Sequence, residues 1–275
     1  MHVREAHLED WLPIDVLISR ARFASPTLWR WERDLPDRGF VVVEIEGRVE
    51  GALLAVADES PVAWVRLAAV GDALPLGQWL DVSLPPIVSH LRTLDARRLA
   101  WMDHGEWARP FLEARGFHPL TDVITLAKTD RVAPRIDPAP VRIRPASREE
   151  FGTLAAIDRR AFEPAWWRSE ASMRRRAATA SRFVVAERRG SVVGYAEREH
   201  HPPTAHLNRI AVDPDHQGRA IGATLLRHVL VSLWKSGAAA VSLNTQRTNW
   251  RSRRLYERFG FQPTGDSVTV WELQL

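Results

Sequence analysis

The chain has 275 residues, of which 45% are hydrophobic and 26% are charged, and its formal net charge is +4. The length exceeds the ~100 to 200 residues typical of one domain, so it predicts two domains of ordinary size. Cys is absent, which excludes disulfides, thiolate nucleophiles and Cys-based metal centres.

The distribution of basic, apolar and histidine residues argues against nucleic acid, a membrane or a metal ion as a partner. The dense basic run Arg174–Arg176 is more typical of a solvated helix face than of a phosphate patch. No apolar run of about 18 residues could span a bilayer, and the charged start MHVREAHLED lacks a signal core. His200 and His201 are adjacent, without metal-ligand spacing. We expect a cytoplasmic protein with no metal.

The two halves of the sequence resemble each other. RGFVVVEIEGRVEGALLA at 38–55 matches SRFVVAERRGSVVGYAE at 181–197, and Phe183 follows Phe40 by 143 positions. FLEARGF at 111–117 matches LYERFGF at 255–261 with an offset of 144. Two distant matches at nearly one offset predict duplication of a whole domain, because solenoid repeats have periods of about 20 to 50 residues.

The connector between the copies is RVAPRIDPAP, at 131–140, which has three Pro and no apolar periodicity. We therefore expect one domain at 1–130, a linker at 131–140 and a second domain at 141–275. Trp29 and Trp31 in the first domain are more typical of core packing than of a ligand cage.

The second copy alternates strand and helix patterns. We predict strands, including a hairpin at 183–199, and helices from the apolar spacing and turn signals. In chain order these elements are a strand at 141–144, helices at 147–161 and 169–180, strands at 183–187, 192–199 and 205–212, a helix at 221–234, a strand at 239–243, a helix at 251–259 and a strand at 268–273. This mixed order predicts an α/β or α+β fold around one central sheet.

The turn between 205–212 and 221–234 is rich in small residues and opens a helix. Such a turn presents unpaired backbone N–H groups and the positive end of the helix dipole, which suit a phosphate or pyrophosphate. The alternative is a helix start that needs small residues for packing. It is neither a P-loop nor a dinucleotide fingerprint, because both of those patterns are missing.

The loop Gln217-Gly218-Arg219-Ala220-Ile221-Gly222 resembles the Q/R-x-x-G-x-G/A pyrophosphate loop of GNAT acetyltransferases. Ala220 departs from the usual Gly, and we expect it to keep a helical conformation. Asn249, seven residues before Tyr256, is similar to the second signature of that family. The segment Phe162–Trp167 is similar to the acceptor-side loop of protein N-terminal acetyltransferases, such as those that modify a ribosomal protein alanine.

The resemblance implies tandem folds, each with a mixed, mostly antiparallel sheet flanked by helices, and acetyl-CoA as co-substrate. It implies that Tyr256 protonates or hydrogen-bonds the departing thiolate, with a structural core Tyr as the alternative. It also implies that the cofactor lies between splayed strands. The cofactor-binding residues would be Ile210, Ala211, Val212, Gln217, Gly218, Arg219, Ala220, Ile221, Gly222, Ala223, Asn249 and Tyr256.

The general base is less defined. The related enzymes often carry Glu at the position of Asn244, so this chain lacks that base. Glu197, Glu199 and His206 lie on strands expected to face the acceptor, and Glu163 lies on the loop above. We favour Glu197, because a carboxylate could remove the proton of an alkylammonium acceptor.

The first copy lacks both signatures. Its equivalent turn has no Q/R-x-x-G-x-G/A pattern, and Pro85 and Pro86 should interrupt the following helix. Gly105 and Leu112 stand opposite Asn249 and Tyr256. The first copy therefore resembles the degenerate half of tandem GNAT proteins.

These observations predict an N-acetyltransferase that moves the acyl group from acetyl-CoA to a primary amine by direct attack. The sequence leaves the acceptor open between a small amine, an antibiotic amino group and a peptide N-terminus, and it leaves the oligomeric state open. The alternative is a catalytically weak acyl-CoA sensor, which the replacement of Glu by Asn244 would favour.

Overall fold

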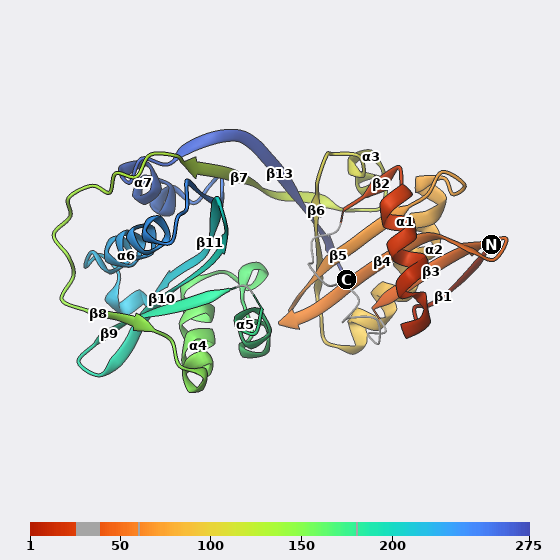
Figure 1. The fold of residues 1–275 in the computed structure, drawn as a ribbon. Coiled ribbons are helices and arrows are strands. Elements are labelled where there is room, and N and C mark those ends of the chain that lie inside the picture. Colours follow the sequence, from red (N-terminus) through yellow and green to blue (C-terminus); the bar gives the residue numbers. More distant parts are fainter. Residues whose placement is uncertain (26–38, 60, 180) are drawn as a thin grey trace. The chain divides into compact units, whose positions relative to one another are not determined.

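The computed structural model describes residues 1–25, 39–59, 61–179 and 181–275. The chain forms two compact units, one of residues 1–121 with 268–275 and one of residues 122–267. Each unit has a sheet with helices on its faces (Figure 1). Trp29 and Trp31 lie outside the described residues.

The first unit has the strand order β1-β3-β4-β5-β6-β13, with β2 beside β5. The β5·β6 pair is parallel and the other described pairs in this unit are antiparallel. Its elements are β1 (His2–Glu5), η1 (Leu8–Asp10), α1 (Trp11–Arg20), β2 (Phe23–Ala24), β3 (Phe40–Ile45), β4 (Arg48–Glu59), β5 (Val62–Val70), α2 (Leu76–Thr93), β6 (Arg98–Asp103) and α3 (Arg109–Glu113).

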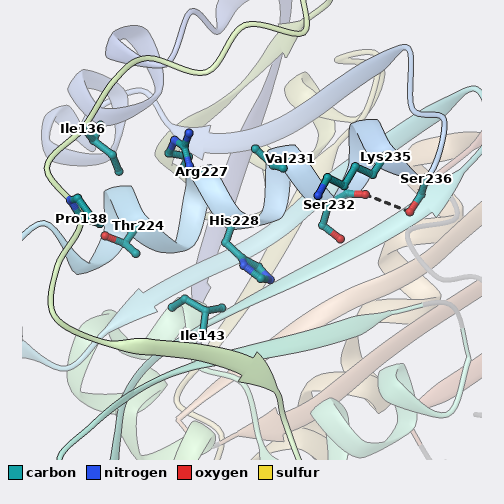
Figure 2. A pocket seen from close by; sticks show the side chains of 10 residues that line it. All are labelled: Ile136, Pro138, Ile143, Thr224, Arg227, His228, Val231, Ser232, Lys235 and Ser236. Atoms are coloured by element: carbon teal, nitrogen blue, oxygen red, sulfur yellow. Dashed lines mark hydrogen bonds between the residues drawn. The ribbon is translucent and has the colours of Figure 1, made fainter.

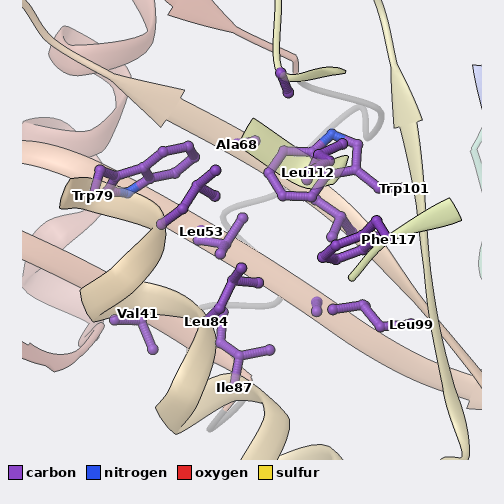
Figure 3. Close-up of a cluster of buried hydrophobic side chains, with 14 of the residues drawn as sticks. Val41, Leu53, Ala68, Trp79, Leu84, Ile87, Leu99, Trp101, Leu112 and Phe117 are labelled. Atoms are coloured by element: carbon purple, nitrogen blue, oxygen red, sulfur yellow. The ribbon is translucent and has the colours of Figure 1, made fainter. Parts of the chain in front are cut away.

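Helix α2 corrects one prediction, because it continues through Pro85 and Pro86 to Thr93. The two prolines remove backbone donors. Leu84, Ile87 and other residues of the helix are nevertheless buried in the core of the unit (Figure 3). Burial of an apolar side chain contributes about 1.5–3 kcal/mol, so this packing offsets the lost hydrogen bonds.

The second unit has the strand order β8-β9-β10-β11-β12-β7. Only β11·β12 is parallel among these described pairs. Its elements are β7 (His118–Lys128), β8 (Arg142–Pro145), η3 (Arg148–Glu150), α4 (Phe151–Ala161), η4 (Pro164–Trp166), α5 (Glu170–Ala177), β9 (Arg182–Arg188), β10 (Ser191–His201), β11 (Thr204–Val212), η5 (Pro214–His216), α6 (Ile221–Lys235), β12 (Ala240–Gln246), α7 (Trp250–Arg258) and β13 (Gln262–Gln274). The predicted mixed sheet flanked by helices is confirmed.

Two cores cover the faces of this sheet. Side chains of α6 and α7 pack with alternate residues of β10, β11 and β12 on one face, and Leu207 and Leu243 belong to this core. Side chains of α4 and α5 pack with Phe183, Tyr195 and Ala211 on the other face. Alternation along the strands thus assigns each side chain of β11 to one face.

The two copies exchange strands. Val123–Lys128 of β7, at the end of the first copy, pairs antiparallel with β12 in the second unit. Thr269–Gln274 of β13, at the end of the second copy, pairs antiparallel with β6 in the first unit. The connector at 131–140 separates the two sequence repeats, whereas the compact units each include a strand from the other repeat.

Candidate functional site

A gap opens between the central strands of the second unit. β11 and β12 pair in parallel from Thr204 with Ala240 to Leu207 with Leu243, and the ladder ends there. A bulge at Asn208 follows, where Glu197 pairs with Arg209 and Arg198 with Leu207.

Beyond the bulge, β11 keeps only one neighbour among the described strands. Ile210, Ala211 and Val212 pair with β10 on one edge, and β12 does not pair with their other edge. These three predicted cofactor-binding residues therefore present backbone groups to the gap, as an added strand would require.

The start of α6 lies directly after β11. The first hydrogen bond of the helix runs from Thr224 N to Ala220 O at 2.9 Å, so the amides of Ile221, Gly222 and Ala223 precede it and have no acceptor within the helix. The side chains of Ile221 and Ala223 are buried in the core, which leaves their backbone as the part available to a ligand. This arrangement suits an anion.

Ala220 does not keep a helical conformation as we expected. It lies in the left-handed region, with φ 58°, and Gly218 has φ 76°. The usual Gly at position 220 is explained by this conformation, because a Cβ there is strained. Positive φ values at 218 and 220 turn the backbone of the loop around Arg219, which is exposed.

Gly222 has space for a side chain within the protein. A Cβ built there would lie 3.7 Å from Leu255 Cδ2 and 3.9 Å from Val212 Cγ2, which is ordinary contact. Packing therefore does not require glycine at this position. A ligand bound at the start of α6 would explain why a residue without a side chain stands at position 222.

Gln217 connects the loop to its surroundings through both ends of its amide. Its Nε2 donates to Val212 O at 2.8 Å, and its Oε1 accepts a hydrogen bond from Arg251. Arg251 is not among the residues predicted to bind the cofactor. Its position in the first turn of a helix that begins beside the loop is the pattern that could have indicated it. Arg219 and Arg251 can both complement the charge of a phosphate there.

The second signature places Asn249 at the start of α7. Its Oδ1 accepts from Ser252 N at 3.2 Å and its Nδ2 donates to Gln246 Oε1 at 3.4 Å, so the side chain caps the helix. This cap is a structural role, and cofactor binding by Asn249 stays a prediction.

Tyr256 is 8% exposed, and its ring lies edge-on to Phe261. Burial raises the pKa of Tyr256 to about 12, while Arg209 and Ser252 act to lower it. The hydroxyl therefore stays protonated at neutral pH and can donate a hydrogen bond.

Glu197 lies in an ion-pair cluster on the α4 and α5 face. Its carboxylate, which is fully buried, accepts from Arg168, from Arg176 and, at 2.8 Å, from Ser181 Oγ. Burial alone would raise the pKa of Glu197, but the two guanidiniums outweigh it and hold this pKa below its usual range.

A carboxylate with these partners is a poor proton acceptor, so the environment argues against Glu197 as the general base. Arg176 also departs from expectation, because it reaches into this buried cluster and is not only part of a solvated face. Glu199 is paired too, with Arg176 at 3.0 Å. Glu163 is exposed and does not cap η4.

A second buried network holds the acceptor-side segment. Arg209 donates to both carboxylate oxygens of Asp158 at 2.8 Å, and the Tyr195 hydroxyl donates to the same group at 2.5 Å. Arg209 also donates to Trp166 O and stacks 3.5 Å from the centre of the Phe162 ring. These contacts bind the segment 162–168 to β11.

The first unit lacks the corresponding cofactor features. The connection between its equivalent strand and helix spans 71–75, five residues, against the eight residues at 213–220. A Cβ on Gly51 would lie 2.5 Å from Trp79, which fills this region of the core with Trp101 and Leu112 (Figure 3).

A groove of about 510 Å³ lies along α6 beside the segment 136–143 (Figure 2). One wall is fixed by a 2.9 Å hydrogen bond from Ala139 N to Thr224 Oγ1. The predicted cofactor-binding and catalytic residues do not line this groove, so we do not assign acetyl-CoA to it. Its lining residues are Ile136, Pro138, Ile143, Thr224, Arg227, His228, Val231, Ser232, Lys235 and Ser236.

Across residues 1–25, 39–59, 61–179 and 181–275, no three His, Asp or Glu side chains cluster in a way that could hold a metal ion. Within the same described ranges, no helix combines the length and the apolar character needed to cross a bilayer.

The chain is similar to known acetyltransferases in sequence and in fold. Residues 150–261 match the model of the acetyltransferase (GNAT) family. The chain is 31% identical over 206 residues to a mycothiol acetyltransferase from Acidimicrobium ferrooxidans, which covers 66% of this chain and 65% of that protein, less than two thirds of its length. The second copy, residues 141–275, makes up about half of the chain. The matched part is 66% of the chain, so the similarity extends beyond the second copy.

The chain is also 32% identical over 136 residues to the N-alpha-acetyltransferase RimI of Mycobacterium tuberculosis, which covers 47% of this chain and 83% of that protein. Among solved structures, a tandem GNAT protein from the clavulanic acid biosynthesis pathway has a TM-score of 0.66 at 18% identity, with 99% of this chain and 98% of that chain covered. The structural likeness concerns the fold.

Proposed function

This chain belongs to the acetyltransferase (GNAT) family, and from that premise we propose that its second unit transfers an acetyl group from acetyl-CoA to a primary amine. The observation that carries the proposal is the divergence of β11 and β12 after Leu207 and Leu243, directly beside the open N-terminus of α6. A strand-like ligand with a phosphate end fits such a gap.

Different residues along the gap bind different parts of acetyl-CoA. The amides at 221–223, with Arg219 and Arg251, hold the pyrophosphate through charge-assisted hydrogen bonds. The backbone of 210–212 holds the pantetheine arm. Acetyl-CoA, when bound, supplies an acetyl group activated as a thioester. The cluster around Asp158 and Arg209 positions the acceptor-side segment.

Tyr256 assists the departure of the thiolate. Its pKa of about 12 exceeds that of a free thiol, which is about 8.5, so complete proton transfer to sulfur would be unfavourable. Hydrogen-bond donation to the developing thiolate is the role that this environment supports.

The acceptor is a primary amine of a small molecule or a peptide N-terminus. The names of the two relatives, a mycothiol acetyltransferase and an N-alpha-acetyltransferase, support these two classes. The segment 162–168, held by Arg209, would border the acceptor in either case.

A titration calorimetry experiment tests the cofactor site. We expect one acetyl-CoA per chain, because the first unit lacks the loop. Gly222→Asp should weaken binding by about 10²-fold or more through repulsion of the phosphates, while Gly222→Ala, which adds a Cβ without a charge, should weaken binding less. Two comparable sites per chain, or equal affinity of a folded Gly222→Asp variant, would contradict the assignment.

A panel of amines then tests turnover. The chain has no Cys, so a thiol-reactive dye reports only the released CoA. Acetyl-CoA binding without amine-dependent thiol release would favour the alternative of an acyl-CoA sensor.

A further inference from the structure

His206 and Ser242 form a hydrogen-bonded pair at the point where β11 and β12 begin to part. They are direct partners in the parallel ladder, one pair before Leu207 and Leu243. Since Leu207 and Leu243 point into the core under α6 and α7, His206 and Ser242 point to the opposite face, where the Glu197 cluster lies. Asn244 follows on the same face of β12.

The contacts of Ser242 orient the imidazole. His206 Nδ1 lies 2.8 Å from Ser242 Oγ, and this hydroxyl lies 3.4 Å from Ala205 O as its acceptor. A hydroxyl has one proton, so both contacts form together only if Ser242 donates to the carbonyl and His206 Nδ1–H donates to Ser242. His206 Nε2 then has a free lone pair, and it has no hydrogen-bond partner among the described residues.

The charged groups around His206 leave it uncharged and available. Burial lowers the pKa of His206, and Arg176 of α5 and Arg168 of the preceding segment act in the same direction, against Glu199 and Glu197 of β10. Both carboxylates are already paired with arginines. At the bulge, two residues after His206, the side-chain Nδ2 of Asn208 is buried and has no hydrogen-bond partner among the described residues.

Resting on the acetyl transfer proposed above, we propose that His206, oriented by Ser242, is the general base that removes a proton from the acceptor ammonium. It would take over the part that a carboxylate at position 244 would otherwise play. Asn244 cannot accept a proton, and the base then acts from the neighbouring strand, one residue pair before the gap.

The proposed transfer conserves atoms and charge. His206 Nε2 takes one proton from the ammonium and later passes it to water. The neutral amine attacks the thioester carbonyl, so that a C–N bond forms and the C–S bond breaks. The thiolate leaves with a hydrogen bond from Tyr256, and the second nitrogen proton goes to solvent, which leaves an amide, CoA thiolate and two protons.

Kinetics on the full chain test the role. His206→Gln should lower kcat/KM for the amine by about 10²-fold or more with acetyl-CoA affinity unchanged. The wild-type pH profile should show an acidic limb below the usual pKa of histidine, and this limb should be absent in His206→Gln. Free imidazole should restore part of the activity of His206→Ala, which a merely structural role would not allow.

The positioning role of Ser242 has its own measurement. Nitrogen NMR should show His206 as the Nδ1–H tautomer, with its signal assigned by its loss in His206→Gln. Ser242→Ala should mix the tautomers and lower kcat/KM by about three- to tenfold, while Ser242→Thr should keep both values.

Three outcomes would overturn the inference: an Nε2–H tautomer, a His206→Gln enzyme within threefold of wild type, or an unchanged acidic limb. The proposed function fails in a different way. If the wild-type chain binds acetyl-CoA but acetylates no amine, the transfer itself is refuted, and the base with it.

Discussion

Gln217 donates a 2.8 Å hydrogen bond to the carbonyl of Val212, and this bond ties the loop before α6 to the end of β11. Arg251 holds the other end of the amide, so two side-chain hydrogen bonds of Gln217 fix the loop to its surroundings. Gln217→Ala should weaken acetyl-CoA binding by about five- to tenfold, the scale of one lost hydrogen bond with its ordering. Calorimetry measures the change, with Gln262→Ala, at an exposed residue of β13, as the control. Equal losses in both variants would show that the loop needs no such tie.

Ala220 carries backbone strain that glycine would remove. Its φ of 58° places it in the left-handed region, where a Cβ costs about 1–2 kcal/mol. Ala220→Gly should therefore raise the melting temperature by about 2–8 °C for a domain of this size. Ala223→Gly is the matched control, because position 223 is helical and buried, and the same change there should lower the melting temperature. A fall in both variants would contradict the strain.

The exchanged strand predicts which fragments fold. Residues 123–128 of β7 pair with β12, so a fragment of residues 141–267 would expose that edge of the sheet. A fragment of residues 122–267 restores the strand. We expect only the longer fragment to melt cooperatively and to bind acetyl-CoA, as judged by circular dichroism and calorimetry. Folding of the shorter one would show that β7 is dispensable for this unit.

The parts of the candidate site that could be predicted from the sequence are those that a short local pattern marks. The loop at 217–222 and the spacing of Asn249 and Tyr256 each depend on a few neighbouring residues, and the family comparisons confirm the resemblance that they indicated. The Arg209–Asp158 pair joins residues 51 positions apart, and no local pattern marks it. The same limit hid the strand exchange, because edge pairing depends on the whole sheet.

The expectation of a helix break in the first copy was wrong for a local reason. Pro85 and Pro86 indicated a helix break because propensity was considered without the packing of α2. The interpretation of Glu197 as the base rests on its carboxylate and its strand, and no local pattern shows that Arg168 and Arg176 pair with it.

Glu197 gives a prediction for stability against pH. Its folded-state pKa is lowered, so its contribution is present above the unfolded pKa, about 4.3, and is lost as the pH falls through the lower folded value. Glu197→Gln leaves Arg168 and Arg176 without their buried partner and should destabilise the fold by about 3–5 kcal/mol. Denaturant melts from pH 7 to pH 3 measure both effects. A variant as stable as wild type that has lost turnover would return Glu197 to the role of base.

The two tyrosines of the chain allow one matched comparison. Tyr256 is buried on α7 with its pKa raised to about 12, so its hydroxyl stays a donor throughout the assay range. If it stabilises the departing thiolate, Tyr256→Phe should lower kcat by about 10²-fold, with acetyl-CoA affinity nearly unchanged. Because the pKa is so high, no basic limb from this residue should appear in the wild-type profile below about pH 11.

Tyr195 is the control, because its hydroxyl is also buried and donates to Asp158 at 2.5 Å. Tyr195→Phe removes one bond from a buried carboxylate that Arg209 still holds through both oxygens, so it should cost about 1–3 kcal/mol of stability and lower kcat far less than Tyr256→Phe does. The pair separates chemistry from folding, since one variant should lose turnover and the other stability. A Tyr256→Phe enzyme with full kcat, or equal losses of stability in both variants, would assign Tyr256 to the core and leave the site resting on the loop at 217–222.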